Sequence, residues 1–153
     1  MSLKTKLVEK YPEISKSPLI LEVPLLWGDM DSAKHVNNLV YLKWAETSRI
    51  LLFDKMMDTS FEGEEGPILG WQDCKYIFPM TFPDTALVTC HVTEIMTDRF
   101  MMKSKIFSMK HCRIAAISNQ SIVPYNYEQL KKIAIPKLWL PKLEELFIQE
   151  HSQ

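Results

Sequence analysis

The longest apolar stretch of the sequence directly follows a cluster of polar residues in the first third of the chain. From residue 38 to about residue 57, apolar or small side chains recur at spacings of three and four residues, which predicts one long helix. Asn37 or Asn38 is a suitable N-cap for it. Apolar side chains also lie off the main stripe, so we expect the helix to be buried on nearly every side. Its narrow polar strip consists of Lys43, Glu46 and Arg49.

Segments rich in β-branched and apolar residues predict one strand before this helix and four strands after it. The first strand covers residues 18–26, and Pro24 within it favours an edge of the sheet, because proline cannot donate to a ladder. The later strands cover residues 68–78, 86–96, 99–109 and 112–125. The last three follow one another through short connections and should form an antiparallel meander.

The segments between and beyond these elements are polar or short. Residues 1–16 predict a short helix or a frayed arm, residues 58–66 a glycine-containing loop, and residues 141–149 a short helix with proline in its first turn. The whole pattern predicts a single α+β domain over residues 1–153, in which an antiparallel sheet is wrapped around one long central helix. Its core spans about residues 19–136, and residues 137–153 form a C-terminal extension. The sheet's outer side and edges would still need covering, which predicts a homodimer.

Composition narrows the class of protein. A net charge of −1 argues against a nucleic-acid binder that depends on a broad basic field. No apolar run approaches the roughly 20 residues of a membrane span, and charged residues stand where a signal peptide needs apolar ones. Cys74, Cys90 and Cys112 lack paired or metal-binding spacing and predict reduced thiols. We therefore expect a cytoplasmic protein without a metal.

The polar cluster before the long helix carries the candidate chemistry. Asp29, Asp31 and His35 lie within seven residues of one another, directly before the helix start. Asp31 could be a general base for water or a direct nucleophile. Partial desolvation beside the apolar helix would raise its pKa. His35 could orient water, donate to a carbonyl or hold Asp31 in place.

The helix start itself offers a second element of such a site. Backbone N–H groups around Val36, Asn37 and Asn38 face the positive end of the helix dipole and could stabilise a developing oxyanion. Each polar residue also has a purely structural interpretation. The aspartates are common turn formers, and the two asparagines are common caps.

This segment resembles the hotdog-fold acyl thioesterases, and most closely the 4-hydroxybenzoyl-CoA thioesterase-like group and the plant acyl-ACP thioesterases. Their D-x-D-x-x-x-H-V-N-N-x-x-Y pattern is matched by Asp29, Asp31, His35, Val36, Asn37, Asn38 and Tyr41. Further along the chain, Tyr76, Pro79, Phe82 and Asp84 resemble a second segment of the family, which lies at a turn between two strands. The resemblance covers about residues 19–136. It implies the hotdog fold and a dimer with active sites at the subunit interface.

The resemblance also implies roles for individual residues. The catalytic carboxylate would be Asp31, with Asp29 as an acceptor that stabilises the loop. Two departures bear on this. The common bacterial form has glycine where this chain has Lys34, and the plant enzymes have asparagine where it has Ala33.

Other candidate residues lie outside the motif. Some hotdog thioesterases use a helix glutamate, which would be Glu46, although an ion pair with Arg49 is the simpler interpretation. The phosphates of a CoA or carrier-protein substrate call for basic residues, and Arg99 and Lys103, together with Lys105, share one face of a predicted strand. A solvated strand face is the alternative.

The expected function is hydrolysis of acyl or aryl thioesters of CoA or acyl carrier protein, by catalytic residues Asp31 and His35. Substrate-binding residues would be Val36, Asn37, Asn38, Tyr41, Arg99 and Lys103. We expect no cofactor other than the coenzyme A of the substrate, and a homodimer or a tetramer made of two dimers. Two alternatives remain open at this point: a non-catalytic protein that binds acyl thioesters, and a hotdog-fold dehydratase.

Overall fold

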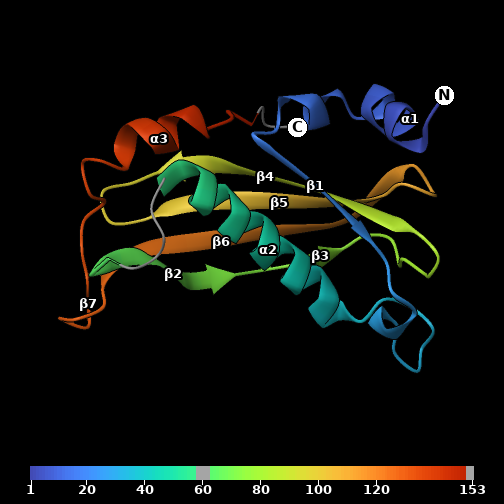
Figure 1. Ribbon diagram of the computed structural model, residues 1–153, viewed down its shortest axis with the longest axis horizontal. Coiled ribbons are helices and arrows are strands. Elements are labelled where there is room, and N and C mark those ends of the chain that lie inside the picture. The colour runs from blue at the N-terminus through green and yellow to red at the C-terminus, as the bar shows by residue number, and fades with distance from the viewer. Residues whose placement is uncertain (58–62, 151–153) are drawn as a thin grey trace.

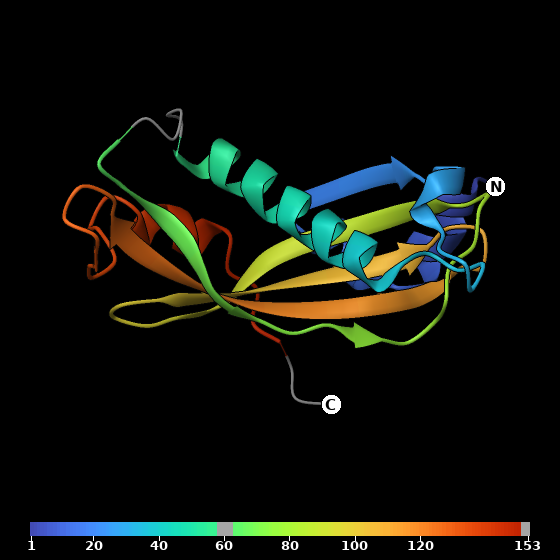
Figure 2. The same cartoon turned by 90° about the horizontal axis from the view of Figure 1, so that it is seen from below.

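The long helix α2 (Asn38–Met57) lies diagonally across one face of a curved antiparallel sheet (Figures 1 and 2). The structure is a computed structural model that describes residues 1–57 and 63–150. The predicted start of this helix is confirmed, with Asn37 as the capping residue: its Oδ1 accepts a hydrogen bond from the Leu39 N–H at 2.9 Å. Residues 58–62 of the predicted loop at residues 58–66 lie outside the described residues.

The sheet has the strand order β1-β4-β5-β6-β2, and β3 and β7 also pair with β6. The predicted meander is confirmed as β4, β5 and β6, and the predicted edge position of the strand that contains Pro24 is confirmed as β1. Strand β2 lies at the opposite edge. The strands are β1 (Leu19–Pro24), β2 (Glu65–Gln72), β3 (Lys75–Tyr76), β4 (Thr85–Ile95), β5 (Phe100–Ser108), β6 (Arg113–Asn126) and β7 (Lys131–Lys132).

The single strand predicted at residues 68–78 is wrong, because the structure divides it into β2 and β3. The division falls at Asp73, whose carboxylate accepts hydrogen bonds from the backbone N–H and the side-chain amide of Asn119 on β6. This side chain replaces part of the regular ladder, so the strand is interrupted and then resumes at Lys75. The propensity of the surrounding residues gave no sign of the interruption.

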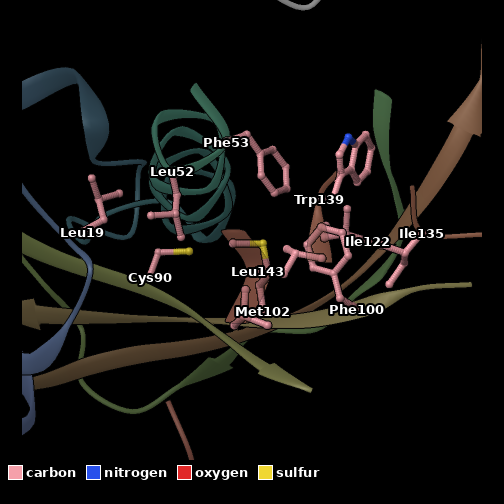
Figure 3. Close-up of a cluster of buried hydrophobic side chains, with 11 residues drawn as sticks. Leu19, Leu52, Phe53, Cys90, Phe100, Met102, Ile122, Ile135, Trp139 and Leu143 are labelled. Atoms are coloured by element: carbon pink, nitrogen blue, oxygen red, sulfur yellow. The ribbon is translucent and has the colours of Figure 1, made fainter. Parts of the chain in front are cut away.

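The hydrophobic core lies between α2 and the sheet face that it covers, which we call the inner face. Leu52 and Phe53 of α2 meet Cys90, Phe100 and Met102 of the sheet, and helix α3 (Leu140–Glu145) adds Leu143 to the same cluster (Figure 3). Nearer the start of α2, Tyr41 and Trp44 pack on a second group of buried side chains, which includes Ala86, Val88 and Ile106.

The prediction that α2 is buried on nearly every side is wrong for the single chain. Leu39 is 61% exposed, Ile50 41% and Leu51 38%. The sheet curves under the helix and does not close over it, as Figure 2 shows. Apolar side chains near both ends of α2 therefore remain exposed, and the exposed Lys43 and Glu46 lie between them.

Both ends of the chain help to cover the sheet. Helix α1 (Leu3–Lys10) and a 3₁₀ segment (Pro12–Lys16) place Leu7 and Ile14 against Leu87 and Phe107 on the outer face, opposite α2. The C-terminal helix is shorter than predicted. After it, the backbone becomes extended, and Val92 bonds to Leu146 and Ile148 beyond the end of β1. Along the described chain, no helix is both long and apolar enough to cross a membrane.

The contrast between neighbouring leucines on α2 tests this account of the core. Leu52 is fully buried and Leu51 is 38% exposed. We expect Leu52→Ala to lower the free energy of unfolding by about 2–5 kcal/mol, since it removes transfer free energy and leaves a cavity. Chemical denaturation gives the value. Leu51→Ala is the matched control and should cost clearly less; equal losses for the two variants would contradict the assigned orientation of the helix.

Candidate active site

The loop from Trp27 to Asn37 is held in a fixed shape by its own hydrogen bonds. Asp29 accepts a bond from the Leu26 N–H through Oδ2 at 2.7 Å and from the Asn37 N–H through its carbonyl at 2.9 Å. Met30 and Val36 form a short antiparallel bridge. The predicted role of Asp29 as an acceptor that stabilises the loop is confirmed.

Asp31 lies at the tip of this loop, beside the start of α2. Its Oδ1 accepts a hydrogen bond from the Ala33 N–H at 2.8 Å, and its Oδ2 lies 3.4 Å from the donating Nδ2 of Asn37. Asn37 thus caps the helix with its oxygen and holds the carboxylate with its nitrogen. In the single chain Asp31 is exposed, so the desolvation expected for it requires a cover that the chain alone does not provide.

The structure changes the part assigned to His35. The contact between His35 and Asp31 is a backbone bond, from the Asp31 N–H to the His35 carbonyl at 3.1 Å. The side chain that holds the Asp31 carboxylate is Asn37. The imidazole of His35 is exposed and makes no hydrogen bond to any residue in 1–57 or 63–150, so it is free to turn toward a bound molecule.

Of the three backbone N–H groups predicted to form an oxyanion site, two already have hydrogen-bond acceptors within the chain. The Val36 N–H donates to the Met80 carbonyl and the Asn37 N–H to the Asp29 carbonyl, both at 2.9 Å. The prediction that these two groups could bind an oxyanion is therefore wrong. The Asn38 N–H has no partner among the described residues and stands at the first position of α2, where the helix dipole favours negative charge.

Lys34 occupies a position that suits glycine. Its φ is 61°, in the left-handed region that glycine adopts without strain. A glycine at this position would therefore adopt the same loop shape without strain. The Lys34 side chain is exposed. Ala33 takes part in the site only through its backbone N–H.

A cavity of about 330 Å³ opens beside Asp31. Tyr41 and Tyr76 meet edge to face in it, with ring centroids 5.4 Å apart. The Tyr76 hydroxyl donates to the Asn38 carbonyl at 3.0 Å, and the Tyr41 hydroxyl accepts from the Met80 N–H at 3.1 Å. Burial raises the pKa of Tyr41. The lining residues are Asp31, Val36, Asn38, Tyr41, Tyr76, Ile77, Phe78 and Pro79.

The second sequence segment thus contributes to the same place as the first, through Tyr76 and Pro79. Asp84 of that segment has a different task, because its carboxylate accepts from the Ser108 hydroxyl at the end of β5 and from the Lys110 N–H in the β5–β6 connection. Met80 was missed by sequence reasoning. Both its N–H and its carbonyl tie this segment to the start of α2, and backbone contacts of this kind leave no sequence signal.

Two predicted substrate-binding residues lie away from Asp31. Arg99 follows the turn between β4 and β5, and both its Nε and its Nη2 donate to Asp98. Lys103 pairs with Glu150 on the outer face of the sheet, opposite α2. Neither residue lines the cavity beside Asp31 that is described above.

The predicted surface ion pair of Glu46 and Arg49 is also wrong. Arg49 is only 5% exposed, Glu46 is exposed, and no ion pair between them forms in the described structure. Burial lowers the pKa of Arg49, an effect that nearby Glu46 partly offsets. Its Nη1 has no hydrogen-bond partner among the described residues.

Over residues 1–57 and 63–150, no group of three His, Cys, Asp or Glu side chains is placed to hold a metal ion.

The sequence of the chain matches a known protein family. The family model of the thioesterase-like superfamily matches residues 25–145, which include the whole of this site. The chain belongs to the thioesterase-like superfamily. Membership in this superfamily supports thioester hydrolysis in general. A comparison with curated protein sequences finds no match.

Similar solved structures show the same fold. A predicted thioesterase from Bacillus stearothermophilus is 19% identical, with a TM-score of 0.79 over 87% of this chain and 98% of that one. A thioesterase-superfamily structure from Jannaschia sp. CCS1 is 19% identical, with a TM-score of 0.78 over 94% of each chain. A 1,4-dihydroxy-2-naphthoyl-CoA thioesterase from Synechocystis is 18% identical, with a TM-score of 0.73 over 83% of this chain and 96% of that one. The predicted hotdog fold is confirmed.

The backbone at Lys34 gives a test of the loop geometry. A non-glycine residue in the left-handed region costs about 1–2 kcal/mol of folding free energy. Glycine avoids this cost, but its greater backbone entropy in the unfolded chain offsets part of the stabilisation. We expect Lys34→Gly to raise the free energy of unfolding by about 0.5–1 kcal/mol. Thermal or chemical denaturation measures it. Ala33→Gly, one residue earlier without a positive φ, should be destabilising; a loss of stability in both variants would contradict the assigned geometry.

Proposed function

We propose that this protein hydrolyses acyl or aryl thioesters of coenzyme A or acyl carrier protein, with Asp31 as the catalytic carboxylate. The observation that carries the proposal is the position of Asp31. Its carboxylate accepts from Ala33 and Asn37 and lines an aromatic cavity that Asn38 also lines, and the Asn38 N–H has no partner among the described residues. A carboxylate and an oxyanion donor at one cavity are what attack on an activated carbonyl requires.

The chemistry follows from these two groups. The thioester carbonyl oxygen would accept a hydrogen bond from the Asn38 N–H, where the N-terminus of α2 stabilises the negative charge that develops in the transition state. Asp31 would either take a proton from an attacking water or attack the carbonyl itself, with water later cleaving the resulting anhydride. In both routes the C–S bond breaks, and the thiolate leaves and is protonated. The exposed imidazole of His35 would donate that proton or orient the water.

We further propose that the active unit is a homodimer. Strand β2 lies at the edge of the sheet, and Leu69 and Trp71 on it are 39% and 53% exposed. On α2, Ile50 and Leu51 are 41% and 38% exposed. An edge strand with exposed apolar side chains favours pairing with a second copy. Such pairing would supply the cover that Asp31 lacks.

The substrate is proposed only by class. The cavity beside Asp31 is lined by aromatic rings and suits an apolar acyl or aryl group. The structural neighbour from Synechocystis is named for an aryl-CoA thioester, which supports including aryl esters among the candidates. No cofactor is proposed beyond the coenzyme A or carrier protein that the substrate itself brings.

The first test is the carboxylate. Release of free thiol should be measured over a panel of acyl- and aryl-CoA esters and, for any that fail, acyl carrier protein esters. We expect at least one ester to be cleaved and Asp31→Asn to lower kcat at least about 100-fold, which is the low end for loss of a general base. Asp29→Asn is the matched control, and it should lower stability while keeping most of the activity.

Three outcomes would count against this assignment. Full activity in Asp31→Asn would reject Asp31 and turn attention to Glu46 and His35. Equal losses of kcat in the two aspartate variants would indicate a structural role for both. A blank panel for both CoA and carrier-protein esters would favour the interpretation as a protein that binds thioesters without cleaving them.

The second test is the assembly. We expect the wild-type protein to sediment as a dimer or a larger assembly, and Leu69→Lys to sediment as a monomer with lower thiol release, because it puts a charge on the proposed edge interface. Ile20→Lys makes the same change on the exposed side of β1, at the opposite edge of the sheet, and should stay assembled. A monomeric wild type, or an unchanged Leu69→Lys variant, would reject this interface.

A further inference from the structure

The outer face of the sheet, opposite α2, carries a second cavity that the proposed chemistry does not use. It measures about 700 Å³, within the usual range for small-molecule sites. Its floor is formed by β4 and β5, and the two ends of the chain form its walls: the 3₁₀ segment Pro12–Lys16 on one side and the C-terminal tail on the other. We call it the outer-face cavity. Its ionisable residues are Glu13, Lys16, His91, Lys103, Lys105 and Glu150.

The strand register brings the basic residues together. His91 on β4 stands opposite Lys103 on β5, and Thr89 stands opposite Lys105. Side chains of alternate residues point to the same face, so Lys103 and Lys105 both enter the outer-face cavity. Lys16 joins them from the N-terminal segment.

One carboxylate already lies among these groups. Glu150 has Oε1 3.2 Å from the Nε2 of His91, and its Oε2 accepts from the ammonium of Lys103. His91 is 6% exposed. Burial lowers the pKa of His91, and the nearby Glu150 acts in the opposite direction. A buried imidazole and an ammonium group thus bind the two oxygens of one carboxylate, as they would bind two oxygens of a phosphate.

Glu150 is held in the outer-face cavity by its own side chain and not by the backbone bonds that fix the rest of the tail. The backbone of the tail is bound to Val92 through the Leu146 carbonyl and the Ile148 N–H, at 2.9 and 3.0 Å. Beyond Ile148, Glu150 is held by its side-chain contacts to His91 and Lys103. The carboxylate can therefore leave while the tail up to Ile148 stays in place.

The charges indicate what would replace it. With Glu150 in place, three lysines face two carboxylates, and Glu13 lies 3.7 Å from Lys105. When Glu150 leaves, the three lysines face Glu13 alone. A phosphate monoester carries about −1.5 to −2 charges at pH 7, which matches this excess better than a single carboxylate does.

We propose that the outer-face cavity binds a small phosphate-bearing anion, and that Glu150 occupies the phosphate position when the anion is absent. The cavity and Asp31 lie on opposite faces of the sheet. Binding in it is therefore a property separate from thioester hydrolysis, and it holds or fails independently of the proposed function.

The test is titration of the full chain with inorganic phosphate and with AMP, a phosphate monoester, followed by calorimetry and by amide chemical shifts at constant ionic strength. We expect saturable binding with shifts around His91 and Lys105. Glu150→Gln should bind several-fold more tightly, because it removes the competing charge. The double variant Lys103→Met/Lys105→Met should bind at least about tenfold more weakly, since it loses two charge-assisted contacts.

Control variants separate binding in the outer-face cavity from attraction to surface lysines in general. Lys110→Met removes an exposed lysine outside the cavity and should bind as the wild type does, and Asp31→Asn should also leave binding unchanged. Thermal melting confirms that each variant is folded. Binding of both probes assigns the site to phosphate esters, and binding of inorganic phosphate alone assigns it to the free ion. No saturable binding, unchanged or weaker binding by Glu150→Gln, or equal losses in the double variant and Lys110→Met would overturn the proposal.

Discussion

The hydrogen bonds that fasten residues 29–37 to the start of α2 are the constraint on which the site depends. Asn37 serves the helix and the loop at once, because its oxygen caps Leu39 and its nitrogen reaches Asp31. Just before the helix, the Asn37 N–H donates to the Asp29 carbonyl and the Val36 N–H donates to the Met80 carbonyl. A helix start leaves N–H groups without intrahelical partners, and Asn37 meets part of that demand by accepting from the Leu39 N–H through its side chain and from the Val40 N–H through its carbonyl. The carboxylate is therefore placed by the same bonds that begin the helix.

This double use of the helix start has a consequence for catalysis. Each N–H that fixes the loop is lost as an oxyanion donor, so in the proposed mechanism the donor function would fall to the Asn38 N–H, the first of α2. A single donor stabilises charge more strongly in a dry site than in water. Asp31 is exposed in one chain, and Leu51 of α2 and Trp71 of β2 also expose apolar surface. In the proposed function, assembly and catalysis would thus be linked by one requirement, the exclusion of water.

Much of this arrangement could be predicted from the sequence, for identifiable reasons. The long helix, its asparagine cap, the meander and the edge position of the strand with Pro24 all follow from periodicity and from local hydrogen-bonding rules. The failures have a different origin. The break at Asp73 and the burial of Arg49 depend on tertiary neighbours, which a single segment does not specify. Sequence spacing likewise could not show that the backbone of Val36 was already in use.

The two faces of the sheet carry different chemistry because strand residues alternate. On β4, Cys90 and Val92 face the core under α2, while His91 between them faces the outer cavity. One strand can therefore support an apolar core and a charged site at the same time, with little room for either to spread into the other. The outer face is then divided by the chain's own ends: Leu7 and Ile14 cover its apolar part, and Glu150 reaches its charged part. The terminal segments thus decide which part of that face is sealed and which part stays open to a ligand.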